Sequence, residues 1–195
     1  METSLNFKIN TSWDGSVTGH APVEVTLYRQ PGDTSLCVRV DAPFFGDPPA
    51  PDGEPGQPFD QLWDYEVVEV FLLNEKGQYL EVELCPHGQH LVLMLNGSRN
   101  MIKDQLPLQY TSSICGSQWQ GIAQIPLAYL PPGVSKVNCY AIHGSGEERQ
   151  YEALYPTPAG KFSQPDFHRL EYFQHINLNH LLAQEEVDQR SSYWT

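Results

Sequence analysis

The sequence predicts an all-β protein, an antiparallel β-sandwich with a short C-terminal helix. Short apolar or alternating stretches recur along the 195 residues, and turn residues separate them at regular spacing. The alternation of strands with long helices that marks a doubly wound fold is absent. A chain of this length should bury roughly 70% of its unfolded surface. We therefore expect one domain over residues 1–178 and a helical or mobile tail over 179–195.

The first expected strands cover residues 5–10, 23–29 and 35–41. In the third, Leu36, Val38 and Val40 alternate with other side chains, which places Arg39 on the face opposite the apolar set. Residues 42–61 are dense in Pro, Gly and Asp and cannot form a ladder. They predict a long loop, and long loops are often functional.

The middle of the chain has the strongest β signal. Strands are expected at 63–74, 78–85 and 90–95, and the turns between them predict three consecutive antiparallel strands. Later strands are expected at 118–125, 136–143 and 150–154, with one helical turn at 127–130 before two prolines. In the tail, apolar residues follow the approximate spacing of a helix that Asn177 or Asn179 would cap: Leu178, Leu181, Leu182 and Val187.

The charge of the chain restricts its partners. A formal net charge of -13 and a pI near 4.8 argue against nucleic acid and against anionic membrane surfaces, because affinity for both comes largely from Lys and Arg. No apolar run approaches the ~20 residues of a membrane span. The first residues lack the pattern of a secretory signal, so we expect a cytoplasmic protein whose four cysteines are reduced and mostly buried.

Residues 63–71 are the most informative segment for function. A period of two places Val67, Glu69 and Phe71 on one face of the expected strand. A carboxylate inside so apolar a strand needs a partner, because burying an unpaired charge is costly. Glu69 either pairs with Arg39 or backbone N–H groups across the sheet, or faces a cleft and accepts hydrogen bonds from a ligand.

The next strand alternates as clearly. Tyr79, Glu81 and Glu83 share one face, opposite an apolar set. Aromatic rings beside carboxylates suit polyhydroxylated ligands, since a ring stacks on a sugar face and a carboxylate accepts from hydroxyl groups. The same acids are also compatible with an ordinary solvated surface, or with a glycosidase that uses two carboxylates.

Metal sites are less well indicated. Residues 85–90, Cys-Pro-His-Gly-Gln-His, contain soft ligands, but a turn between two strands is the expected interpretation. We expect no metal and no cofactor. Calcium is the alternative, bound by acids of the long loop whose spacing does not match an EF-hand: Asp47, Asp52, Glu54 and Asp60.

Several segments together resemble a known group of proteins. Residues 62–72, Leu-Trp-Asp-Tyr-Glu-Val-Val-Glu-Val-Phe-Leu, and residues 77–88 resemble the DOMON-like and family-nine carbohydrate-binding modules. Residues 119–130 look like the Trp strand of that group, which ends in Ile-Pro, and residues 155–173 look like its closing segment. The chain also resembles, over roughly residues 5–178, a vertebrate family named after an open reading frame of human chromosome four.

The resemblance implies a jelly-roll sandwich and a set of contact residues. In the sugar-binding relatives a tryptophan at the start of a strand and a glutamate six positions later contact the saccharide, and these map onto Trp63 and Glu69. Where relatives carry Arg or Gln after the tyrosine of the next strand, this chain has Leu80 and Glu81. Tyr155 stands near the place of their second stacking tryptophan. The vertebrate family implies a fold and no activity.

The sequence therefore predicts a non-catalytic module that binds a small saccharide or polyol. The predicted ligand-binding residues are Trp63, Glu69, Glu81, Arg39 and Tyr155. An interaction domain that meets another protein through the proline-rich loop or a sheet edge is the alternative. An enzyme of glycan processing is the third hypothesis.

Overall fold

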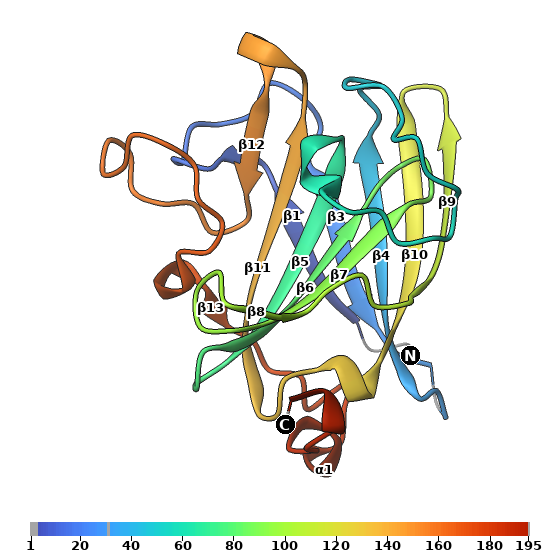
Figure 1. Ribbon diagram of the computed structural model, residues 1–195. Coiled ribbons are helices and arrows are strands. Elements are labelled where there is room, and N and C mark those ends of the chain that lie inside the picture. Colours follow the sequence, from blue (N-terminus) through green and yellow to red (C-terminus); the bar gives the residue numbers. More distant parts are fainter. Residues whose placement is uncertain (1–3, 31, 195) are drawn as a thin grey trace.

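The computed structural model describes residues 4–30 and 32–194, and it shows two antiparallel sheets packed face to face (Figure 1). This arrangement confirms the predicted β-sandwich. The strand order of the first sheet is β1-β3-β4-β10-β9. Its strands are β1 (Ser4–Ile9), β3 (Val23–Tyr28), β4 (Ser35–Pro43), β9 (Gln109–Cys115) and β10 (Gln118–Pro126).

The second sheet carries the features that matter for function. Its strand order is β2-β12-β11-β5-β6-β7-β8, and β13 pairs with β11 outside this path. The predicted run of three consecutive strands is β5, β6 and β7, joined by tight turns. The strands are β2 (Thr11–Ser12), β5 (Val67–Asn74), β6 (Gln78–Leu84), β7 (His90–Asn96), β8 (Met101–Lys103), β11 (Val134–His143), β12 (Gln150–Ala153) and β13 (Gln174–His175).

The main core lies between the two sheets. Leu80, Val82 and Leu84 of β6 point into it, as the alternation predicts, and each is fully buried. Alternate residues of β3, β4 and β10 meet them from the first sheet. Burying one such side chain stabilises the fold by about 1.5–3 kcal/mol, so this layer dominates the stability.

The opposite face of the second sheet is buried as well. The segment between β12 and β13, the long orange loop at the left of Figure 1, supplies aromatic residues that cover it. The Tyr140 ring stacks on Phe167 at 3.9 Å between centroids, and Phe71 stacks on Phe173 at 5.8 Å. The residues that the alternation assigns to an acid-lined face therefore lie in a second buried layer.

Trp63 lies outside the strand that the sequence predicts for it. Residues Leu62–Asp64 form the 3-10 turn η1, and β5 begins only at Val67. Gln61 has a left-handed backbone (φ 57°), which turns the chain before η1. The guanidinium of Arg149 then donates hydrogen bonds to the main-chain carbonyls of Trp63 and Asp64. These contacts hold the backbone away from the sheet.

The predicted short C-terminal helix is present, but it covers fewer residues than the apolar spacing indicates. The helix α1 covers only Gln184–Val187, because Ala183 has an extended backbone (ψ 154°) and the chain turns separately at 178–182. The predicted turn near Pro131 is present as η2 (Leu127–Tyr129). The remaining 3-10 turns are η3 (Gly146–Glu148), η4 (Leu170–Tyr172) and η5 (Ser192–Trp194).

Strand β9 was not predicted. Its sequence, Gln-Tyr-Thr-Ser-Ser-Ile-Cys, is mostly polar because it forms an exposed edge of the first sheet beside β10. Of the four cysteines, all free, Cys115 at the end of this strand is exposed and the other three are buried. Within the described residues no helix has the length and apolar character needed to cross a membrane.

Trp194 provides a test of the C-terminal packing. Its side chain is buried against the main core, and its indole N–H donates to the carbonyl of Tyr129 at 3.2 Å. Replacing Trp194 with alanine should lower the free energy of unfolding by about 3–5 kcal/mol, measured by urea denaturation. The exposed Val17 provides the control, since Val17→Ala should change stability by less than about 0.5 kcal/mol. Equal stabilities of the two variants would contradict this packing.

Candidate functional site

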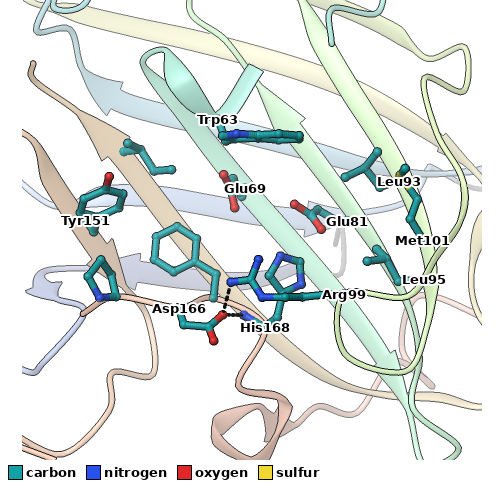
Figure 2. A pocket seen from close by; sticks show the side chains of 13 residues that line it. Trp63, Glu69, Glu81, Leu93, Leu95, Arg99, Met101, Tyr151, Asp166 and His168 are labelled. Carbon is teal, nitrogen blue, oxygen red and sulfur yellow. Dashed lines mark hydrogen bonds and ion pairs between the residues drawn. The ribbon is translucent and has the colours of Figure 1, made fainter. Parts of the chain in front are cut away.

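A cavity of about 340 Å³ opens on the outer face of the second sheet (Figure 2). This volume lies within the range of small-molecule sites. Strands β5, β6 and β7 contribute its floor, and the loops before β8 and after β12 contribute its walls. The lining residues are Trp63, Glu69, Glu81, Leu93, Leu95, Arg99, Met101, Ile142, Tyr151, Pro165, Asp166, Phe167 and His168.

Three glutamates meet near the floor, where Glu69 and Glu81 line the cavity and Glu83 does not. Glu69 on β5 lies directly opposite Glu83 on β6, and Glu81 is the next residue of β6 that points to the same face. Each side chain offers a carboxyl oxygen, and these oxygens lie within 4.8 Å of one another. The three residues are between 0% and 3% exposed. Oε2 of Glu81 and both carboxyl oxygens of Glu83 are buried, and no other described group donates a hydrogen bond to them. Glu81 and Glu83 share a hydrogen bond with each other when one of them is protonated.

Burial changes the protonation of these acids. Loss of hydration raises the pKa of Glu81 to about 8, although a hydrogen bond with Glu83 and the positive charge of Arg99 oppose the shift. The same loss of hydration, together with the negative charge of neighbouring acids, raises the pKa of Glu69 and Glu83 well above the usual range. The group therefore retains protons at neutral pH, and neutral carboxyl groups can donate hydrogen bonds as well as accept them.

Trp63 forms one side of the cavity and Arg149 fixes its position. The indole remains 39% exposed, although Leu62 beside it is fully buried. Arg149 is held in turn by the carbonyl of Gly144 and the hydroxyl of Tyr151. Figure 2 shows Trp63 on one side of the two floor carboxyls, and the opposite side holds a polar cluster. A flat ring is thus presented to the cavity by a fixed backbone.

The polar cluster consists of Arg99, Asp166 and His168. Arg99 pairs with Asp166 at 2.7 Å, and the main-chain N–H of His168 donates to the same carboxylate at 3.0 Å. Partial burial of Asp166 opposes its ionisation, but these two donors outweigh burial and lower its pKa. The cluster keeps a charged pair at the rim, where Arg99 is 62% exposed.

His168 acts as a neutral ring in this cluster. Burial, and then the charge of Arg99, lower its pKa to about 4. The hydroxyl of Tyr79 lies 2.6 Å from Nδ1 of His168 and accepts the main-chain N–H of Arg99. We infer that the hydroxyl donates to Nδ1, which leaves the ring hydrogen on Nε2. Burial also raises the pKa of Tyr79 to about 12, so the hydroxyl keeps its proton.

The structure brings together three of the five predicted site residues. Trp63, Glu69 and Glu81 line the same cavity. Arg39 lies on β4 in the other sheet, where it pairs with Asp41 at 2.7 Å, so it is not the partner of Glu69. Tyr155 lines a small adjoining pocket instead.

The sequence did not identify the walls of the cavity as part of the site. Arg99, Tyr151 and Asp166 come from segments far apart in the chain, and no local pattern relates them to β5. Residues 165–168, Pro-Asp-Phe-His, were recognised only within the closing segment of the family resemblance. Only the expectation that some segment must cover the outer face of the second sheet could have pointed to these wall residues.

Two groups of side chains among the described residues have the geometry to hold a cation. One is the floor group of Glu69, Glu81 and Glu83, where either protons or a cation would relieve the repulsion. The other lies outside the cavity and combines two histidines with a glutamate. The acids of the long loop do not take part in either group, and neither do residues 85–90. Residues 85–90 form the predicted turn between β6 and β7.

Comparison with known proteins reveals close relatives. The chain is 53% identical to UPF0462 protein C4orf33 of Homo sapiens over 194 residues, which covers 97% of this chain and 96% of the human protein. It is 50% identical to the homologue from Danio rerio, again over 194 residues, with 97% and 98% covered. A scan against protein-family models gives no match.

Among solved structures, a candidate carbohydrate-binding protein from Bacteroides uniformis has a similar fold. The TM-score is 0.60 with 15% sequence identity, and the alignment covers 88% of this chain and 84% of that protein. This likeness supports the two-sheet architecture.

The buried acids predict an unusual pH dependence of stability. Below about pH 4.5, the usual pKa of a glutamate, both the folded and the unfolded protein bind the proton of Glu81. Between that pH and about pH 8 only the folded protein keeps it. The free energy of unfolding should therefore fall as pH rises through this interval. Glu83→Gln removes one member of the group and should raise stability by roughly 1–3 kcal/mol at pH 8, but much less at pH 4. Thermal unfolding at both pH values measures this.

A surface carboxylate provides the matched control. Glu75 is exposed and pairs with Lys136, and this contact lowers its pKa. Glu75→Gln should give no gain at pH 8. Parallel pH curves for Glu83→Gln and the wild type would show that the floor acids do not carry raised pKa values.

Proposed function

The chain belongs to the family of UPF0462 protein C4orf33, and from the geometry of the cavity we propose that it binds a small saccharide or polyol without hydrolysing it. The ligand would lie between the ring of Trp63 and the cluster of Arg99, Asp166 and His168, over the floor carboxyls.

One observation carries the proposal. Glu69 and Glu81 line the open cavity, and Oε2 of Glu81 is buried without a hydrogen-bond partner among the described residues. An unpaired buried polar atom costs about 1–3 kcal/mol, and a hydroxyl group from a ligand would remove that cost. A polyol suits neutral carboxyl groups particularly well, because each hydroxyl both donates and accepts.

The walls complement a sugar in other ways. The exposed face of Trp63 can stack on the C–H face of a pyranose ring. The guanidinium of Arg99 and Nε2–H of His168 are donors for ring or hydroxyl oxygens. Leu93, Leu95 and Met101 give one wall an apolar character, which is typical of ligand pockets. The carbohydrate binding assigned to the Bacteroides uniformis protein is consistent with this ligand class.

The position of the acids favours binding over hydrolysis. Glycoside hydrolysis uses one protonated and one ionised carboxyl group on either side of the scissile bond. Glu69 and Glu81 rise from neighbouring strands of the same floor, so both face one side of a bound ligand. Burial raises the pKa of both glutamates. The other carboxylate among the lining residues is that of Asp166, and it is paired with Arg99.

Substitution of Trp63 and Glu69 tests the proposal. The protein would be screened on an array of mono- to tetrasaccharides, and the saccharides it retains would be titrated by calorimetry. Trp63→Ala removes the stacking ring and Glu69→Leu removes the hydrogen-bonding carboxyl group, so each should weaken binding at least tenfold, corresponding to about 1.4 kcal/mol or more. Thermal unfolding of Trp63→Ala should stay close to the wild type, because this side chain is already 39% exposed.

Arg39→Ala is the matched control. This residue was a site residue in the sequence prediction but lies on the other sheet, so the substitution should leave saccharide affinity unchanged. No retention of any saccharide by the wild type would refute the proposal. If the protein consumed the saccharide and released reducing ends, its function would be glycan hydrolysis and the proposal of non-catalytic binding would be wrong.

A further inference from the structure

A second cluster of ionisable side chains lies at the edge of the second sheet, outside the cavity. His20 comes from the loop between β2 and β3, His143 ends β11, and Glu152 lies in β12. The Nε2 atoms of His20 and His143 lie 2.6 and 2.9 Å from the same oxygen, Oε1 of Glu152. Three segments thus direct two imidazoles and a carboxylate to one point.

The hydrogen bonds of His20 determine where its ring hydrogen lies. Nδ1 is 2.8 Å from the carbonyl oxygen of Ala21, which can only accept, so Nδ1 carries a hydrogen. A neutral His20 then has a lone pair at Nε2, and this lone pair faces Oε1 of Glu152 at 2.6 Å. Two acceptors at this distance require a positive species between them. That species is either an additional proton or a metal ion.

The surroundings favour a metal ion. A metal-bound histidine usually donates its other N–H to a carbonyl or carboxylate, and the contact of His20 with Ala21 has this form. Oε2 of Glu152 is buried without a hydrogen-bond partner among the described residues, and the side chain is only 2% exposed. A cation held through Oε1 would compensate the negative charge of this buried carboxylate.

Phe45 and Glu66 complete the surroundings of the cluster. The Phe45 ring stacks on His143 at 3.6 Å and meets His20 edge-on at 5.0 Å, which limits access of water. Glu66 lies close enough to His143 for the two side chains to interact electrostatically. The carboxylate of Glu66 accepts the main-chain N–H groups of Phe45 and Gly46, so it adds charge without being free to act as a ligand.

We propose that His20, His143 and Glu152 form a binding site for a divalent transition-metal ion of the zinc class. Two imidazole nitrogens and one carboxylate oxygen are a known three-ligand set for zinc, with the fourth position left to water. Bonds of about 2.0–2.1 Å to the metal place neighbouring ligand atoms roughly 3.3 Å apart. The distance from Oε1 of Glu152 must therefore increase by about 0.7 Å for Nε2 of His20 and by about 0.4 Å for Nε2 of His143. The partly exposed loop of His20 can supply the larger movement.

Metal titration tests the site. The full chain, treated with a chelator and desalted, would be titrated with Zn²⁺ by calorimetry and with Co²⁺ by visible spectroscopy. The wild type should bind one equivalent, show the absorption of four-coordinate Co²⁺, and melt at a higher temperature with Zn²⁺. His20→Ala and Glu152→Gln should each weaken Zn²⁺ binding at least tenfold and abolish the rise in melting temperature. His20 is the safer variant for folding, because its loop is outside both sheets.

His180→Ala is the matched control. His180 is exposed and distant in sequence from all three ligands, so its loss should leave the Zn²⁺ stoichiometry and affinity unchanged. Absence of Zn²⁺ binding by the wild type would refute the proposal and leave a proton-held ion pair. Binding that persists unchanged in both His20→Ala and Glu152→Gln would refute it as well, since the metal would then occupy other residues.

Discussion

The burial of the outer face of the second sheet is the constraint on which the candidate site depends. In a two-layer sandwich one face of each sheet normally meets water, and polar residues alternate with apolar ones for that reason. Here the segment between β12 and β13 covers that face with Phe167 and Phe173. The residues of β5 and β6 that would otherwise be solvated thus lose water, and three of them are glutamates.

Loss of water determines the protonation state of these glutamates. On an open sheet Glu69, Glu81 and Glu83 would be ionised and solvated, whereas under a cover their mutual repulsion and desolvation favour the protonated forms. The cover is incomplete beside Trp63, and the cavity forms where it stops. The same opening therefore exposes groups that need hydrogen-bond partners and admits a ligand that can provide them.

The two ionisable clusters differ in a way that separates their roles. The floor cluster contains only carboxyl groups, so protons can neutralise it, and each neutral group remains able to meet hydroxyl groups. The cluster at the edge places two imidazole nitrogens against one carboxylate oxygen, with the ring hydrogen of His20 already committed to a carbonyl. Oxygen-rich and nitrogen-containing sets select different ligands, and the two proposals can be tested independently because no residue is shared.

The sequence by itself determined the all-β class, the strands from β5 to β7, and the shared face of Glu69 and Glu81, because a period of two is a local property of the backbone. It also identified Trp63, through a resemblance to other proteins. It placed Arg39 among the ligand-binding residues, with Glu69 as a possible partner, and predicted a tail helix longer than α1, since sheet partners and chain turns depend on contacts between distant residues. Only the tertiary structure decided that the acid-lined face is buried, and that Arg99, Asp166 and His168 complete its cavity. Burial and proximity arise when separate segments pack together, and no local period of the sequence encodes them.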